Sequence, residues 1–255
     1  MKKISFFFVK LLIKLIQLIQ SILNRATFYL DVLKIYINGN ECAKLKDCFL
    51  LQTLRKKQPP GSDRYIEYPW MLENISISRG RLLDIGSTKG DNLYELLPKT
   101  IEINCININE KKFKHKEIKF FKGDIRNTFF PDNYFDCATC ISTLEHIGVS
   151  GRYGNGEDRE GDIKAMKEIR RTVKPGGILI LTVPYGIRDV LPINKLYNKK
   201  RIEKLLEGFN IINNEFRKYN PKWAVWLKVS EEEAAVTDMI RDKWYAINLI
   251  KAVKL

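Results

Sequence analysis

The sequence predicts an α/β protein with a mostly parallel sheet and helices on both of its faces. From residue 61 onward, short apolar runs alternate with helical stretches, which is the pattern of such a sheet. The apolar run that opens "LLDIGSTKGDN", residues 82–92, passes directly into a turn with two glycines. A chain of 255 residues with 45% hydrophobic content is also long and apolar enough to bury a full core.

The expected elements follow from these runs and from the residues that interrupt them. Strands are expected at 81–85, 102–107, 117–121, 134–141, 177–183, 209–216 and 245–253. Helices are expected at 62–77, 89–97, 160–173 and 194–207. The third of these helices should end at "VKPGG", because a proline followed by two glycines does not continue a helix.

Residues 1–25 predict an amphipathic helix that associates with a membrane surface. Its polar positions Lys10, Lys14, Gln17, Ser21 and Asn24 are spaced by three or four residues and form one narrow stripe, with Gln20 beside it, on a mostly apolar helix. Charged residues interrupt the segment too often for a spanning helix, whereas lysines at the edge of an apolar face suit the headgroup region. A helix that packs on its own domain or on a second subunit is the alternative.

The next segment, residues 26–60, is interpreted as a helical or linker segment, and residues 61–255 as the main domain. A charge run and "QPPG" mark the boundary between them. Residues 1–60 contain eleven Lys or Arg and three Asp or Glu, so they carry +8 of the total net charge of +14. This bias favours contact with anionic lipid, phosphate-bearing substrates or nucleic acid.

Cysteine and histidine usage indicates neither a disulfide framework nor a metal site. Five cysteines are an odd number for a secreted disulfide protein, so reduced thiols in the cytosol are expected. Cys137 and Cys140 lie in one expected strand and should point to opposite faces, which favours core packing over redox chemistry. The two histidines are far apart in the sequence and lack ligand spacing, so no metal is expected.

The turn after the first strand lies where ligands bind in sheets of this type, beyond the carboxyl ends of the strands. Gly86 and Gly90 allow a tight turn and close approach of the backbone, and Asp84 offers a fixed acceptor. The spacing is neither that of a dinucleotide fingerprint nor that of a P-loop. On these residues alone, a small-molecule site and an ordinary turn both remain open.

Several segments in order make the pattern specific: "LLDIGSTKG", "CININE", "FKGDIRN", "FPDNYFDCATCISTLEHIG" and "EIRRTVKPGGILILTVP". Together they resemble the class I S-adenosylmethionine-dependent methyltransferases, particularly the group that includes the ubiquinone and menaquinone biosynthesis enzymes. The resemblance covers roughly residues 80–185. It implies a Rossmann-like, seven-stranded sheet with an antiparallel last strand, and S-adenosyl-L-methionine as the cofactor.

The resemblance also implies a set of cofactor-binding residues. These are Asp84, Gly86, Ser87 and Gly90 in the first loop, Asn107 after the second strand, Asp124 and Ile125 at the adenine, and Ser142 beside the transferred methyl group. Thr88 stands where a middle glycine is common, and Asn107 where an acid usually binds the ribose hydroxyls, which predicts weaker cofactor binding. Asp124 merely capping a turn and Asn107 merely ending a strand are the alternatives.

Catalysis is expected from the stretch after the fourth strand, "STLEHIG". His146 or Glu145 is positioned there to take a proton from a substrate hydroxyl, and an imidazole is suited to this near neutral pH. The alternatives are that both residues only orient the loop, or that alignment of the reactants supplies most of the rate. Arg152 and Tyr153, in the glycine-rich stretch 148–162, are the expected contacts to the acceptor.

The acceptor itself is predicted only by class. "GRYG", "GDIKAMKEI" and "KPGG" resemble a subgroup linked with sugar and cell-surface polysaccharide modification. With the helix at 1–25, this favours O-methylation of a small-molecule, glycan or lipid-linked acceptor by a cytoplasmic protein peripheral to the inner face of the membrane. A lipid quinone is the close alternative. An RNA methyltransferase is a further alternative, which is disfavoured because the charge excess lies on the tail. A scaffold without catalysis is another alternative, and the oligomeric state stays open.

Overall fold

The computed structural model of the chain describes residues 62–86, 93–110, 112–113, 117–150, 156–220 and 225–255. The predicted helix at 1–25 and the segment 26–60 lie outside these residues and stay predictions. Contacts divide the chain into two compact units, of which the larger comprises Trp70–Lys218 and Lys228–Leu255. The described residues of the smaller unit include the first turns of the helix that starts at Arg64. They also include Tyr219 and Trp226, whose rings are in tilted contact.

Eight strands form one sheet in the order β3-β2-β1-β4-β5-β8-β6-β7. Their bounds are Gly80–Ile85 (β1), Ile101–Asn107 (β2), Lys119–Lys122 (β3), Phe135–Ile141 (β4), Val173–Tyr185 (β5), Phe209–Asn220 (β6), Val225–Val229 (β7) and Ala246–Lys254 (β8). Strands β3, β2, β1, β4 and β5 run parallel, and β8 is antiparallel to both β5 and β6. The predicted mostly parallel sheet with an antiparallel last strand is confirmed, but it has eight strands instead of seven because β7 adds an edge.

Strands β1 and β4 are neighbours inside the sheet and pair over Leu82–Ile85 and Cys137–Cys140. Both strands are nearly continuous apolar runs because helices cover parallel sheets on both faces. Leu83 and Ile85 belong to the main core, together with residues of the helices on that side. Asp84, between them, therefore points to the opposite face, which places a carboxylate at the carboxyl end of β1.

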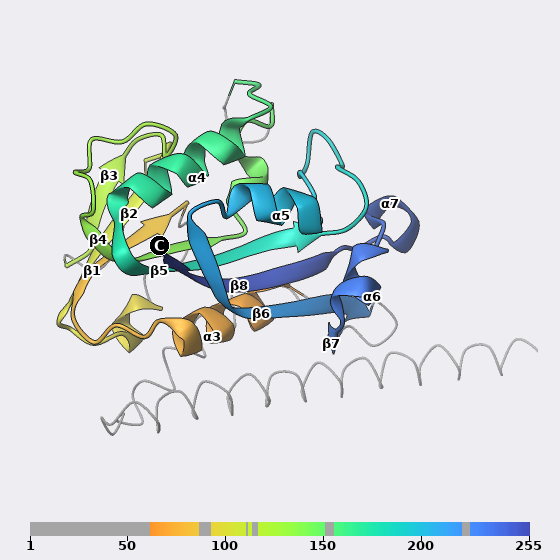
Figure 1. Ribbon diagram of the computed structural model, residues 1–255, viewed down its shortest axis with the longest axis horizontal. Helices are drawn as coiled ribbons and strands as arrows, with labels where there is room; N and C mark the ends of the chain where they lie inside the picture. Colours follow the sequence, from red (N-terminus) through yellow and green to blue (C-terminus); the bar gives the residue numbers. More distant parts are fainter. Residues whose placement is uncertain (1–61, 87–92, 111, 114–116, 151–155, 221–224) are drawn as a thin grey trace, which may run out of the picture. The chain divides into compact units, whose positions relative to one another are not determined.

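Helices lie on both faces of the sheet (Figure 1). Their bounds are Arg64–Asn74 (α3), Gly161–Thr172 (α4), Lys199–Leu205 (α5), Glu231–Ala235 (α6) and Met239–Asp242 (α7), with 3₁₀ turns at Tyr94–Leu96 (η1) and Leu144–His146 (η2). Helices α4 and α5 contribute apolar side chains to the main core. On the other face, Trp70 and Asn74 at the end of α3 hydrogen-bond to side chains of β6, at 3.2 and 3.1 Å.

The helices differ from the prediction at three places. The helix expected at 194–207 begins only at Lys199, because the Asn198 side chain caps it by accepting from the Arg201 amide at 3.0 Å. Of the helix expected at 89–97, the described part is only η1, and residues 87–92 lie outside the described residues. Helices α6 and α7 were not expected, since each is a single polar turn without an apolar periodicity.

The two cysteines of β4 are buried inside the protein, in agreement with the predicted packing role. Cys137 and Cys140 are fully buried free thiols of β4, and only Cys140 belongs to the core that α4 and α5 cover. Burial raises the pKa of Cys137 to about 12 and that of Cys140 well above its usual value, so neither forms a reactive thiolate.

Among the helices that the structure describes, none is long and apolar enough to cross a membrane.

Glu168 of α4 anchors the loop that follows β3, and this contact predicts an acid-sensitive part of the stability. Its carboxylate accepts from the amide and hydroxyl of Thr128, both at 2.7 Å, and pairs with Arg171 at 2.7 Å. The Arg171 and Thr128 hydrogen bonds lower the Glu168 pKa from 4.5 to about 2. Because the folded-state pKa is depressed, this stabilisation is complete above the unfolded value and is lost as the pH falls through the folded one.

We therefore expect Glu168→Gln to lower the free energy of unfolding by about 2 kcal/mol near neutral pH. The difference from the wild type should shrink as the pH falls from 4.5 towards about 2, where the carboxylate is protonated. Urea unfolding followed by circular dichroism at several pH values measures both quantities. A destabilisation that stays constant with pH would show that the charge of Glu168 is not what anchors the loop.

Candidate functional site

Asp84 is the buried acid of the candidate site. It ends the apolar run of β1, and its side chain is only 4% exposed. The Thr139 hydroxyl, from the neighbouring strand β4, donates to Asp84 Oδ1 at 2.8 Å, and the Cys105 thiol of β2 lies 3.9 Å from Oδ2. A carboxylate held by both neighbouring strands has a fixed direction, as a binding acceptor requires.

Gly86 is where the loop after β1 meets the loop after β4. Its φ is +77°, and its amide donates to the carbonyl of Ile106 at 2.9 Å. A Cβ at this position would lie 2.3 Å from Cγ2 and 2.5 Å from Oγ1 of Thr143. Both the backbone conformation and the close approach of Thr143 therefore require glycine here.

Asn107 and Asp124 follow β2 and β3 at the same edge of the sheet. The Asn107 side-chain oxygen accepts from the Asn109 amide at 2.9 Å, and its carbonyl accepts from Gly123 at 3.0 Å. Asp124 Oδ1 accepts from the Arg126 amide at 2.9 Å, so both side chains cap a turn, as the alternative for Asp124 described. The two side chains are only partly buried, which keeps oxygen acceptors near the surface.

Arg126 holds the Asp124 carboxylate in its charged form. The guanidinium pairs with Asp124 Oδ2 at 2.6 Å and also reaches Asp158 Oδ2 at 3.2 Å. Burial opposes ionisation of Asp124, but the hydrogen bonds from Arg126 outweigh it and lower its pKa. Arg126 thus ties the loop after β3 to the segment that precedes α4.

Ser142, directly after β4, has a strained backbone. Its φ is +40°, a conformation that residues other than glycine rarely adopt. The strain is held in place because the Ser142 amide donates to the carbonyl of Thr182 on β5 at 3.2 Å and to its hydroxyl at 3.0 Å. Strained residues of this kind cluster at binding and catalytic sites, and this one turns the chain from β4 into η2.

Glu145 and His146 lie side by side in η2, and they differ in exposure. The Glu145 side chain is 4% exposed and that of His146 is 15% exposed, with 3.7 Å between His146 Nε2 and Glu145 Oε1. His146 Nδ1 lies 3.1 Å from the carbonyl of Ile193. Since a carbonyl only accepts, this contact favours the tautomer with the proton on Nδ1, in which Nε2 is the basic nitrogen of the neutral ring. His146 is the better placed of the two to meet an acceptor.

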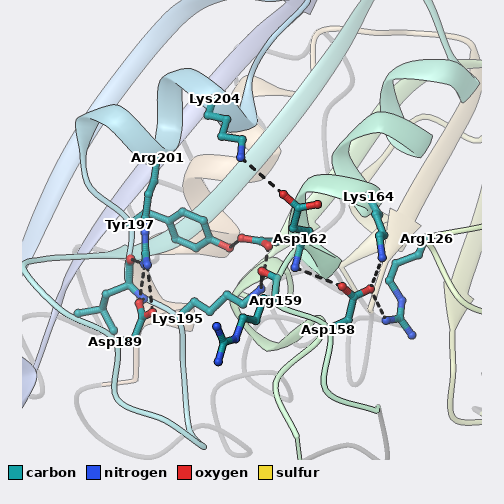
Figure 2. A network of polar contacts seen from close by, with 12 residues as sticks. Arg126, Asp158, Arg159, Asp162, Lys164, Asp189, Lys195, Tyr197, Arg201 and Lys204 are labelled. Atoms are coloured by element: carbon teal, nitrogen blue, oxygen red, sulfur yellow. Dashed lines mark hydrogen bonds and ion pairs between the residues drawn. The ribbon is translucent and has the colours of Figure 1, made fainter.

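Figure 2 shows a polar network that connects α4 with the segment before α5. Lys195 and Tyr197 converge on the Asp162 carboxylate, with Nζ 2.7 Å from Oδ1 and the phenol oxygen 3.0 Å from Oδ2. All three residues are buried. Burial and the nearby carboxylates of Asp162 and Glu145 raise the Tyr197 pKa well above its usual value, so its hydroxyl stays protonated and donates.

The predicted site residues divide into three groups. Asp84, Gly86, Asn107, Asp124 and Ser142 lie at the carboxyl ends of β1 to β4, with Glu145 and His146 in the turn that follows β4. Ile125, expected beside the adenine ring, is 5% exposed and part of the core. Ser87, Gly90, Arg152 and Tyr153 lie outside the described residues and stay predictions. In the described part of the chain, no group of three or more His, Cys, Asp or Glu side chains is arranged to hold a metal ion.

The sequence interpretation missed the residues that support these groups. Thr139 had no predicted role, Thr143 was expected only beside the transferred methyl group together with Ser142, and Arg126 was not connected with Asp124. The spacing Asp-x-Arg in "GDIRN" was a local signal for that pair, because a side chain two residues on reaches back to a turn acid. Asp162 and Lys195 had no such signal, since they are 33 residues apart.

Two relatives with established names are methyltransferases. The chain is 29% identical over 149 residues to the sterol 24-C-methyltransferase ERG6B of Gibberella zeae, covering 53% of this chain and 34% of the relative. It is 24% identical over 153 residues to the ubiquinone/menaquinone biosynthesis C-methyltransferase UbiE of Vibrio cholerae, covering 54% of each. The chain thus spans about a third and about half of these relatives. The predicted resemblance to class I S-adenosylmethionine-dependent methyltransferases is confirmed.

A solved structure and a family model complete the comparison. The N-methyltransferase NodS of Bradyrhizobium japonicum, solved with S-adenosyl-L-homocysteine, is 15% identical, with a TM-score of 0.52, covering 78% of this chain and 90% of NodS. At this identity the match establishes the fold, which is the Rossmann-like methyltransferase fold. A family model matches residues 96–251, more than half of the sequence. The chain therefore belongs to the family described as "Caenorhabditis protein of unknown function, DUF268".

Proposed function

We propose that this protein is an S-adenosylmethionine-dependent methyltransferase with His146 as its general base. The observation that carries the proposal is the convergence of Asp84, Asn107 and Asp124 at the carboxyl ends of three adjacent strands, with His146 in the turn after the fourth. Ligands of open α/β sheets bind at this edge. The named relatives are methyltransferases, which makes methyl transfer the first choice among the reactions that this fold hosts.

The side chains at this edge fit S-adenosyl-L-methionine. The buried Asp84 carboxylate suits the cationic methionine end, the Asn107 amide offers one acceptor and donors to the ribose, and Asp124 is an acceptor for the adenine amino group. When bound, this cofactor supplies a methyl group already activated by its sulfonium. Arg126 contributes by keeping Asp124 ionised, and Gly86 by allowing the backbone to turn closely against Thr143.

His146 is suited to take the proton of an acceptor hydroxyl. Its Nδ1 donates to the Ile193 carbonyl, so Nε2 is free of a proton in the neutral ring and is the nitrogen that accepts one. The Glu145 carboxylate, 3.7 Å from Nε2, stabilises the imidazolium that results. This favours an oxygen acceptor, as predicted; a ring carbon of a lipid quinone is the alternative, because the named relatives are C-methyltransferases.

Exposed apolar side chains in the segment that contacts His146 through the Ile193 carbonyl, and around α7, favour an acceptor with an apolar part over a free sugar. They are Ile187, Leu191 and Ile193 after β5, and Val236 and Ile240 around α7, each at least 42% exposed. The two segments are joined, since the Ile187 amide donates to the Thr237 carbonyl at 3.0 Å and Arg188 pairs with Asp238. Apolar surface of this kind typically binds a partner or ligand. A lipid-linked acceptor fits these features best. Residues 1–25 would bind an anionic membrane surface and so bring the protein to such an acceptor.

The experiment that tests the function has a binding arm and a transfer arm. Calorimetric titration of the full-length wild type with S-adenosyl-L-methionine and S-adenosyl-L-homocysteine should give saturable binding to one site. In the transfer arm, labelled methyl groups should enter a lipid extract presented in anionic vesicles in preference to the water-soluble glycan or RNA fraction.

His146→Asn should keep cofactor affinity but lower transfer about 100- to 10,000-fold, as expected for a general base. Thr128→Ser, which keeps the hydroxyl that donates to Glu168, is the control and should leave both arms unchanged. Absence of cofactor binding by the folded wild type would favour the scaffold alternative. Equal transfer by His146→Asn and the wild type would assign catalysis to Glu145 or to alignment alone.

A further inference from the structure

We propose that Lys195 is a positioning residue for His146. Its ammonium group, bound to Asp162, fixes the segment whose Ile193 carbonyl holds the imidazole with the proton on Nδ1. This role rests on the proposed function of His146 as the general base, but it concerns the imidazole itself and is measurable without turnover. Lys195 is not expected to touch cofactor or acceptor, because its side chain is 11% exposed and faces α4.

The contact of His146 with Ile193 decides which nitrogen is basic. A neutral imidazole in water favours the proton on Nε2, whereas the carbonyl at 3.1 Å from Nδ1 requires the proton on Nδ1. The ring nitrogen beside the buried Glu145 carboxylate is then the one that accepts a proton. If the Ile193 carbonyl moved away, the ring would lose this preference.

The turn that carries the carbonyl gains little from apolar packing. Its backbone is closed by three hydrogen bonds. The Val190 carbonyl accepts from the amides of Ile193 at 2.8 Å and Asn194 at 3.0 Å, and the Val190 amide donates to the Asn194 carbonyl at 3.0 Å. The side chains at its tip are exposed, at 63% for Leu191 and 42% for Ile193. Its location therefore depends on polar anchors at its two ends.

Lys195 is the anchor next to the turn. Its amide donates to the Glu145 carbonyl at 3.1 Å, and its ammonium donates to Asp162 at 2.7 Å and to the Arg159 carbonyl at 3.1 Å. One residue thus ties the turn to η2 and to the start of α4. A buried ion pair with its hydrogen bonds satisfied adds little net stability, but it fixes one arrangement of the groups that it connects.

The other end of the turn has an independent anchor. Asp189 accepts from the Leu196 amide at 2.8 Å and pairs with Arg201, and Figure 2 shows this pair on the far side of Tyr197 from Asp162. It keeps the segment folded when Lys195 is replaced. Removal of Lys195 is therefore expected to loosen the turn at His146 without detaching the whole segment.

The experiment is nitrogen-15 spectroscopy of the histidine side chains in the full-length protein, which has only two histidines, His115 and His146. His115→Gln assigns the signals. Lys195→Met is compared with the double variant Lys195→Met/Asp162→Asn, which removes both charges and leaves no unpaired charge buried. Lys195→Gln keeps a donor towards Asp162. The matched control is Lys204→Met, which breaks the exposed 3.8 Å pair with Glu160 on the same side of α4.

We expect a proton on Nδ1 of His146 in the wild type, Lys204→Met and Lys195→Gln. In Lys195→Met and the double variant the signals should shift towards a mixture dominated by the Nε2-protonated ring, while far-ultraviolet circular dichroism stays that of the wild type. A folded double variant with the wild-type signature would overturn the role of Lys195. Since the spectrum needs no cofactor, failure of the wild type to bind S-adenosyl-L-methionine would refute the proposed function separately.

Discussion

Gly86→Ala is expected to lower the affinity for S-adenosyl-L-methionine at least about tenfold, which is a loss of about 1.4 kcal/mol in binding. Alanine at φ +77° is strained, and its Cβ would lie 2.3 Å from Thr143 Cγ2, so the loops after β1 and β4 must move apart. The free energy of unfolding should fall by about 3 kcal/mol, from backbone strain and overpacking together. Calorimetry and urea unfolding measure the two effects.

Gly176→Ala separates strain from steric contact. Gly176 has nearly the same φ, +74°, but no atom within 4 Å of where a Cβ would lie. We expect it to cost only about 1 to 2 kcal/mol of stability and to leave cofactor affinity unchanged. In Gly86→Ala/Thr143→Ala the nearest clashing atoms are removed, and part of the affinity should return. Equal affinity in Gly86→Ala and Gly176→Ala would mean that the contact with Thr143 does not shape the cofactor site.

The parallel half of the sheet was predictable because its signal is local. Strands β1, β2 and β4 are apolar runs that end at a polar residue, and the fully buried side chains of Leu82, Leu83 and Ala138 show why such runs need no polar alternation. The start of β5 was placed too late, because "KPGG" was interpreted only as a helix end. Val173 pairs with Phe135 before the strand resumes at Ile178, so the proline and glycines lie within an irregular strand.

The outer elements were not predictable from periodicity. Strand β7 has five residues, and α6 and α7 have five and four, which is too short for a hydrophobic pattern to stand out. What holds α7 in place is a set of caps and ion pairs, with Asp238 accepting from two amides of its first turn and pairing with Arg188. The Arg188–Asp238 pair joins residues 50 positions apart in the sequence, so a pattern within a short sequence segment does not predict it.

The candidate site was predictable to the extent that strand ends mark it. Asp84 lies near the end of β1, and Asp124 comes shortly after β3. The resemblance to the methyltransferases therefore predicted that both carboxylates lie at the same edge of the sheet. The surroundings that decide their state did not follow. The charge of Asp124 depends on Arg126, and the tautomer of His146 depends on a carbonyl 47 residues later in the sequence. Buried polar networks are set by tertiary contacts, which a sequence pattern does not contain.

Asp84→Asn is the second substitution with a large expected effect on the cofactor. The change keeps the size of the side chain and an oxygen for the Thr139 hydroxyl, but it removes the charge proposed to face the cationic methionine end. Since hydrogen bonds to charged groups contribute about 1.5–3 kcal/mol, affinity should fall roughly 10- to 100-fold. The free energy of unfolding should change by only about 1 kcal/mol, because Thr139 still has a partner.

Asp136→Asn is the matched control because Asp136 is also an aspartate of this sheet, at the opposite end of the central strands. Its carboxylate accepts from the Arg81 amide at 2.8 Å and pairs with Lys174 at 2.5 Å. Its replacement should lower stability by a similar amount without changing the cofactor affinity, since no strand end of the candidate site is near it. If both variants lost affinity equally, the effect of Asp84 would be general loosening of the sheet. If only Asp84→Asn did, the charge at the end of β1 would be a direct binding determinant.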